Sequence, residues 1–228
     1  MFQTWLPLLG FTAFFLILHA VAMRWESAWP RAFKLSRGMA AFLLTVLGFA
    51  ALMAGFEHWP QAFLYHHPED DWMRLGLLVV MAHLLSDFLW MGVGTYRHGI
   101  TQRRDLIVHH GVGIVAYAFA LHLRVGYALS LVAMTTELMP VTTGLHALGK
   151  KMSWDGVVQL SDRARLYLLI GFRLPVWVIL FVLVSRVLFL GEPGDLALPF
   201  SVALAGTIGL ICLDVYWIRK ALNNLDFY

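Results

Sequence analysis

The sequence predicts an all-α membrane protein, a polytopic bundle of seven transmembrane helices. Of its 228 residues 60% are hydrophobic and only 14% are charged, and the mean hydropathy is +0.71. Seven apolar runs are long enough to cross a bilayer, which takes about 20 residues for roughly 30 Å of hydrocarbon. This composition disfavours a soluble domain, a disordered chain and a nucleic-acid binder. The single cysteine, Cys212, excludes a disulfide within the chain.

All seven runs are predicted to be helices, because a span must satisfy its own backbone hydrogen bonds in lipid. The first run is interpreted as a retained span and not as a signal peptide, since no basic residue precedes it, no small-residue cleavage site follows it, and Arg24 comes directly after it. In chain order, the predicted spans are 5–23, 39–56, 72–93, 106–123, 125–148, 166–190 and 196–218.

Basic residues predict the orientation. Thirteen of the 17 lysines and arginines lie in the stretches 24–37, 97–104, 150–165 and 219–220, which all fall on one side of the bilayer. The positive-inside rule then places the N-terminus outside and the C-terminus in the cytoplasm. The loop 57–71, with three consecutive acidic residues at its end, falls outside. An integral protein of a bacterial inner membrane is favoured over one of the endoplasmic reticulum, because the chain carries no tail or sorting signal.

One continuous membrane domain is predicted, without linkers or repeats. Residues 1–37 would form an N-terminal transmembrane helix and a cytoplasmic loop, 38–222 a domain of six membrane helices, and 223–228 a short cytoplasmic tail.

Ionisable side chains inside the spans gather toward the cytoplasmic side. Each costs roughly 2.5–3.5 kcal/mol on insertion scales, so each needs a partner, a cavity or a function. At about 1.5 Å per residue, five lie within roughly 10 Å of the predicted cytoplasmic boundary: His19, Asp87, His109, His110 and Asp214. Asp105 lies at that boundary, and three more lie nearer the midplane: His83, Glu137 and Arg173. Their convergence predicts a functional site open to the cytosol.

The densest polar feature opens the fourth span. Asp105 and His109 are four residues apart and share one helix face, where the carboxylate could fix the tautomer of the imidazole. His110 is turned about 100° away and could face Asp87 or Asp214. A histidine beside a carboxylate can act as a base, a nucleophile or a metal ligand. A pair that only binds backbone and phosphate groups at the interface is the structural alternative.

Other polar residues within the spans could have a structural role as well as a functional one. His83 and Asp87 are also four residues apart and could form an interhelical clasp. Glu137 and Arg173 could form an ion pair between the fifth and sixth spans. No His-x-x-x-His or Cys-x-x-Cys motif occurs in the sequence, so neither a metal nor another cofactor is predicted.

These residues, in their spacing, resemble the TLC domain, the module of the TRAM, Lag1 and CLN8 proteins. The resemblance covers roughly residues 38–222 and rests on Asp87, on Asp-Leu-Ile-Val-His-His at 105–110, on Thr-Glu at 136–137, on Arg173 and on Leu-Asp-Val-Tyr-Trp at 213–217. It implies six helices around an apolar tunnel that holds lipid chains, with one extra N-terminal helix. In the ceramide synthase branch the paired histidines are catalytic and acyl-CoA is the donor. Ceramide synthases also carry paired aspartates on the next span, where this chain has only Glu137, so it is nearer the CLN8 branch.

The predicted function is a membrane-embedded lipid acyltransferase that moves a fatty-acyl chain from acyl-CoA or another lipid to a lipid acceptor. The predicted catalytic residues are His109, His110, Asp87, Asp214 and Asp105. The predicted substrate-binding residues are His19, His83, Tyr117, Glu137, Arg173 and Trp217. Two alternatives stay open: a non-enzymatic lipid-binding, sensing or trafficking protein, and a proton-coupled carrier that uses these groups as a relay. The sequence does not identify the oligomeric state.

Overall fold

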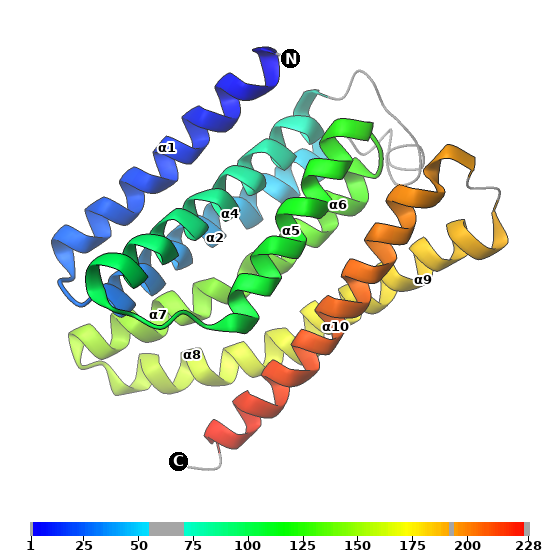
Figure 1. The fold of residues 1–228 in the computed structure, drawn as a ribbon. Helices are drawn as coiled ribbons and strands as arrows, with labels where there is room; N and C mark the ends of the chain where they lie inside the picture. The colour runs from blue at the N-terminus through cyan, green and yellow to red at the C-terminus, as the bar shows by residue number, and fades with distance from the viewer. Residues whose placement is uncertain (1, 55–70, 192–193, 226–228) are drawn as a thin grey trace.

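The computed structural model describes residues 2–54, 71–191 and 194–225, and these fold into helices joined by short turns (Figure 1). Seven helical segments are long and apolar enough to span a membrane, which confirms the predicted all-α bundle. The elements are α1 (Phe2–Trp25), α2 (Trp29–Ala54), α4 (Asp71–His98), α5 (Arg104–Leu123), α6 (Tyr127–Thr135), η2 (Thr136–Leu138), α7 (Met139–Met152), α8 (Asp155–Leu168), η3 (Leu169–Arg173), α9 (Leu174–Leu190), η4 (Gly194–Leu196) and α10 (Ala197–Leu225).

The seven spans lie at the predicted places, but the helices extend further than the apolar runs. The predicted cytoplasmic loop is mostly the first turns of α2, which begins at Trp29. Hydropathy missed these turns because they are amphipathic: Phe33 and Leu35 are buried, whereas Arg31 and Lys34 are exposed. The basic stretch after the fifth span is likewise helical: Lys150 and Lys151 lie in the last turn of α7, and Arg163 and Arg165 lie in α8. The predicted tail begins inside α10, and the predicted loop 57–71 lies outside the described residues except for the first residue of α4.

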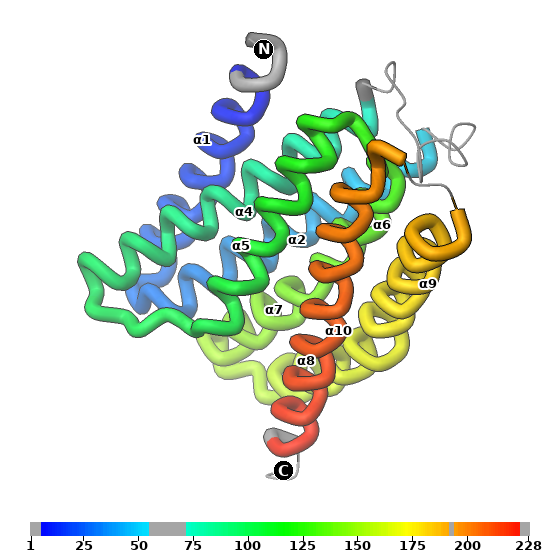
Figure 2. The backbone as a smooth tube through the Cα atoms, turned by 45° about the vertical axis from the view of Figure 1, so that its right-hand side comes forward, coloured from blue at the N-terminus to red at the C-terminus, as the bar shows by residue number. Residues whose placement is uncertain are grey.

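The helices alternate in direction, so the two termini lie at opposite ends of the bundle (Figures 1 and 2). The turns α1–α2, α4–α5 and α7–α8 and the end of α10 share one end, which carries the basic stretches named above and is called the basic end. Helix α1 lies at one edge, against α4 and α2, and α9 lies at the other edge.

The surface of the bundle is apolar and part of its interior is polar. Large hydrophobic side chains such as Leu6, Phe189 and Leu190 are more than 70% exposed, as lipid-facing residues would be. Many histidines and acids are instead fully buried. This distribution is the reverse of that in soluble domains and is the one expected for membrane spans.

Helices α2 and α7 approach each other closely at two glycines. A Cβ atom added to Gly38 would lie 2.9 Å from the Cα of Gly144. Small residues at such a crossing let two backbones touch, which is how membrane helices gain packing energy. The crossing brings residues 34–38 of α2 against residues 140–144 of α7.

A buried acid clamps the α1–α2 turn at the basic end. Glu26 is 3% exposed, accepts a hydrogen bond from the Ala28 N–H at 2.9 Å and pairs with Arg31 at 3.1 Å. Lys151 of α7 adds a 3.4 Å contact to Glu26 and donates to the Trp25 carbonyl at 2.7 Å. The hydrogen bonds from Arg31 and from the Ala28 N–H hold the pKa of Glu26 at about 2.

The fifth span is broken where Pro140 enters α7. A proline has no N–H, so it cannot bond to the carbonyl four residues earlier, that of Thr136. The chain passes through the 3₁₀ turn η2 at this place, and the Thr136 carbonyl accepts a hydrogen bond from Arg173 Nη1 at 3.0 Å. An arginine from the next span thereby satisfies a carbonyl that would otherwise be costly inside the bundle.

The sixth span carries a second break, at η3, which is a single π-helical turn directly before Pro175. Such turns inside helices often mark functional sites. Arg173 is the last residue of this turn and Glu137 lies in η2. Glu137 and Arg173, both predicted to lie near the midplane of the bilayer, are therefore on irregular turns.

Candidate functional site

Asp87 of α4 is fully buried at the centre of a cluster drawn from four helices. Its carboxylate contacts Arg37 Nε at 2.6 Å, His110 Nε2 at 2.9 Å and His19 Nε2 at 3.2 Å. His83 Nε2 is further away, at 3.8 Å. The expected pairing of Asp87 with histidines is confirmed. Sequence reasoning missed Arg37, because it assigned this residue to a cytoplasmic loop.

His110 is engaged at both ring nitrogens. Nε2 faces Asp87, and Nδ1 lies 3.0 Å from the carbonyl oxygen of Leu106. Each ring nitrogen therefore already faces an oxygen of the protein. His110 accordingly offers no free lone pair to a substrate.

His109 has the opposite arrangement. Its Nε2 lies 3.2 Å from Glu137 Oε1, while Nδ1 is buried and has no hydrogen-bond partner among the described residues. When Nε2–H donates a hydrogen bond to the carboxylate, the ring proton is on Nε2 and the Nδ1 lone pair is free. Glu137 thus orients His109 in the way a carboxylate orients a catalytic imidazole.

The prediction that Asp105 orients His109 is wrong. Asp105 bonds to Arg103 and accepts a 2.7 Å hydrogen bond from Trp217 Nε1. It lies in the first turn of α5, and helical side chains point back toward the N-terminus, so it turns toward the preceding loop and α10. The Trp217 ring in turn packs edge-on against His109, with 5.7 Å between ring centroids. Asp105 therefore acts on His109 only through this ring.

The predicted ion pair between Glu137 and Arg173 is also wrong, because each side chain has another partner. Arg173 is 1% exposed and binds Asp214 through Nε, at 2.9 and 3.1 Å. Its guanidinium carbon lies 5.3 Å from the centroid of Trp217. Nη1 reaches the Thr136 carbonyl, and Nη2 is buried with no hydrogen-bond partner in the described part of the chain. The expected pairing of Asp214 with Arg173 is confirmed.

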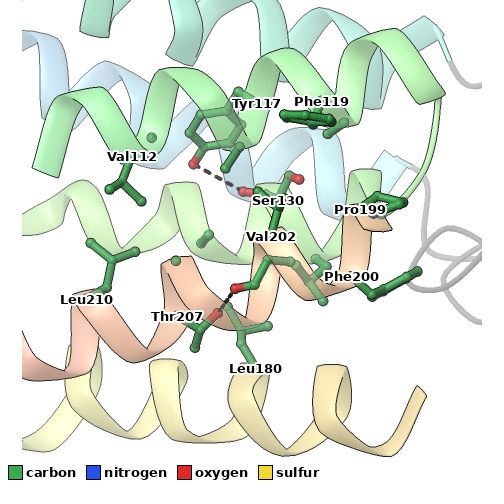
Figure 3. Close-up of a pocket in the computed structure, with 18 of the residues that line it drawn as sticks. Val112, Tyr117, Phe119, Ser130, Leu180, Pro199, Phe200, Val202, Thr207 and Leu210 are labelled. Carbon is green, nitrogen blue, oxygen red and sulfur yellow. Dashed lines mark hydrogen bonds between the residues drawn. The ribbon is translucent and has the colours of Figure 1, made fainter. Parts of the chain in front are cut away.

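An apolar chamber, shown in Figure 3, has His109 in its wall. It encloses about 950 Å³, its open mouth included, between α5, α6, α9 and α10. Two hydroxyl groups of its wall bond to backbone carbonyls: Tyr117 donates to that of Ser130 at 3.4 Å and Thr207 to that of Ala203 at 2.7 Å. Figure 3 shows that the side chains around it are mostly aliphatic or aromatic. The chamber therefore suits a lipid chain.

A polar chamber of about 750 Å³, again with its mouth included, lies toward the basic end. Its wall includes five cations, namely Arg37, Arg103, Arg165, Arg173 and Lys220. His109 and Glu137 line both chambers. The two chambers thus share this pair, and they differ in that the cations lie in the wall of only one of them.

The predicted substrate-binding residues are divided between the chamber walls and the buried interior of the bundle. Tyr117 lines the apolar chamber and Trp217 the polar one, whereas His19 and His83 line neither. His19 bonds to Ser36 and Asp87. His83 is fully buried, and neither of its ring nitrogens has a hydrogen-bond partner among the residues that the structure describes. Among the described ranges, no three His, Cys, Asp or Glu side chains could together hold a metal ion.

No family model, curated protein or solved structure matches this chain. Fold and site define its class: a bundle with seven helices long and apolar enough to span a membrane, built around a buried His109–Glu137 pair between two chambers. The resemblance to the TLC domain stays a prediction.

Proposed function

We propose that the protein is a membrane-embedded lipid acyltransferase and that His109 is its nucleophile. One observation carries the proposal: His109 donates Nε2–H to Glu137, its Nδ1 has no hydrogen-bond partner among the described residues, and the residue lines both chambers. Of the two neighbouring histidines, only this one has an available lone pair. His110 is a positioning residue that ties the start of α5 to Asp87.

The reaction divides into two transfers. Nδ1 of His109 attacks the carbonyl carbon of a thioester or ester, and the bond to the leaving sulfur or oxygen breaks. The Nε2 proton passes to Glu137 and from there to the leaving group, which gives a neutral thiol or alcohol and an acyl-imidazole. An acceptor hydroxyl then attacks the acyl carbon and loses its proton to Glu137. The carbon–Nδ1 bond breaks, and the imidazole recovers its proton at Nε2.

The chambers supply the positioning that such a reaction needs. A path along α5 from His109 to Ala120, both in the wall of the apolar chamber, is about 16 Å at 1.5 Å per residue, the scale of a fatty-acyl tail. A tail held there fixes its carbonyl carbon beside Nδ1 and turns a bimolecular encounter into a positioned attack. The polar chamber would receive the leaving group.

Donor, acceptor and setting belong to the same proposal. The donor is acyl-CoA or another lipid and the acceptor is a membrane lipid. The protein lies in a bacterial inner membrane, with its basic end facing the cytoplasm and its N-terminus outside. The same two chambers also favour lipid binding without transfer, so the experiment must detect chemistry and not binding alone.

Intact-protein mass spectrometry after incubation with palmitoyl-CoA, or with a phospholipid donor, tests the proposal directly. Wild type should gain one acyl mass, and His109→Ala should gain none. His110→Ala should still form the adduct, with a rate lowered by roughly 10²-fold, typical of a lost supporting group. An adduct on His109→Ala would refute the role of this residue. No adduct on any variant, with lipid still bound, would favour the binding protein.

A further inference from the structure

We infer that the polar chamber is a binding site for a phosphate-bearing headgroup. The inference rests on the proposed function and names the chemical class of its substrate. Of the charged side chains that line the chamber among the described residues, five are cations and only Glu137 is an acid. Glu137 is already occupied by His109 at 3.2 Å. The wall therefore presents cations to whatever enters.

The arginines of the wall are held from behind. Arg37, Arg103, Arg165 and Arg173 each contact an aspartate, respectively Asp87, Asp105, Asp162 and Asp214. None of these aspartates lines the chamber. An aspartate that binds one edge of a guanidinium fixes its plane and leaves other N–H groups for a ligand.

One donor in this wall is buried without a partner. Arg173 lines the chamber and is 1% exposed, and its Nη2 has no hydrogen-bond partner in the part of the chain described. Its other two nitrogens are used by Asp214 and by the Thr136 carbonyl. A buried guanidinium N–H without an acceptor is costly. A phosphate oxygen in the chamber would supply that acceptor with a charge-assisted bond.

The position of the chamber fits a molecule with a phosphate at one end and an acyl tail at the other. The phosphate would lie among the cations and the tail in the apolar chamber, so the ester or thioester between them would pass His109 and Glu137, which line both. A coenzyme A and a phospholipid headgroup share this chemistry. A neutral glycerolipid lacks it.

Titration calorimetry on the full chain in a neutral detergent tests the inference with three probes: coenzyme A, dihexanoyl phosphatidylglycerol, and dihexanoylglycerol as the phosphate-free control. Arg165→Gln should weaken phosphate binding about tenfold, as expected for a charge-assisted bond, and Lys220→Gln about threefold, since Lys220 is exposed. Arg163→Gln and Arg219→Gln are matched controls, because both side chains are on the same helices and outside the wall. They should change affinity less than twofold.

Binding of coenzyme A alone would identify a soluble thioester as the source of the phosphate, and binding of phosphatidylglycerol alone would identify a membrane lipid. Either result supports the site if it depends on Arg165 and Lys220. Equal affinity for all three probes, or equal losses in the control variants, would overturn the inference. Lys220→Gln keeps the test valid if Arg165→Gln unfolds, because Arg165 also contacts Asp162 and Thr142.

Failure of this site and failure of the proposed function have different signatures. Phosphate binding that depends on Arg165, without any acylated protein, would leave the site standing and refute acyl transfer. An acyl adduct on His109 with no preference for phosphate-bearing probes would do the reverse.

Discussion

Replacing Glu137 by glutamine tests the arrangement of the site most directly. The change keeps the shape of the side chain and removes its charge at the 3.2 Å contact with His109 Nε2. Loss of a charge-assisted hydrogen bond costs about 1.5–3 kcal/mol, which is roughly a 10- to 150-fold loss of rate. A glutamine NH₂ that turned toward Nε2 would also force the ring proton onto Nδ1 and remove the lone pair. The comparable carboxylate-to-amide change in a serine protease costs about 10⁴-fold.

We therefore expect Glu137→Gln to slow acylation of His109 by about 10²- to 10⁴-fold, with lipid binding nearly unchanged. The assay is the single-turnover rate of acyl-protein formation, followed by intact mass. Asp105→Asn should slow it less than about tenfold, because Asp105 reaches His109 only through the Trp217 ring. Asp155→Asn, an exposed carboxylate on α8, is the control for charge loss alone.

Two outcomes would refute this reasoning. A Glu137→Gln rate within threefold of wild type would mean that the carboxylate does not set the tautomer. An Asp105→Asn variant as slow as Glu137→Gln would restore the expectation drawn from helix spacing. A double variant with His109→Ala should be no slower than His109→Ala alone, because residues that act as a unit are not additive.

Three further predictions concern topology and stability. In a Cys212→Ser background, Tyr96→Cys at the basic end should be labelled by an impermeant maleimide only after cells are opened, and His122→Cys at the other end in intact cells; the reverse pattern would invert the orientation. The folded-state pKa of Glu26 is lowered, so the ionised side chain stabilises the fold fully above its unfolded pKa of about 4.5, and this stabilisation is lost as pH falls toward about 2. Glu26→Gln should therefore make the unfolding temperature depend less on pH in this acid range. An unchanged pH dependence would contradict the clamp. Gly38→Ala puts a Cβ at 2.9 Å from backbone and should cost about 1–3 kcal/mol in thermal unfolding, whereas a neutral result would mean that α2 and α7 separate easily.

Much of the fold could be predicted from the sequence because apolar length determines a membrane helix. What hydropathy missed was helix with a basic face, in the first turns of α2 and in α8. Arg37 shows the consequence: counted as a loop cation, it is in fact 12% exposed and contacts Asp87 within the bundle. A helical plot of residues 29–38, with its buried and exposed sides, would have signalled this.

The sequence predicted which residues form the candidate site better than it predicted which of them contact each other. The high cost of burying charge is enough to predict that His109, His110, Asp87 and Asp214 gather inside the bundle. Spacing along one helix then suggested Asp105 as the partner of His109, while the structure supplies Glu137 from another helix. Spacing can identify residues on a shared face, but it contains no information about which neighbouring helix faces them.

The two prolines explain why that partner was hard to find from periodicity. A regular helix through the fifth span would keep the Thr136 carbonyl bonded along its own axis. Pro140 prevents this, and the freed carbonyl accepts from Arg173, which the π-turn before Pro175 carries. Glu137 lies in the same broken turn, so regular 100° steps do not fix its direction. The irregular backbone that accepts the hydrogen bond from Arg173 Nη1 is therefore also the feature that brings a carboxylate to His109.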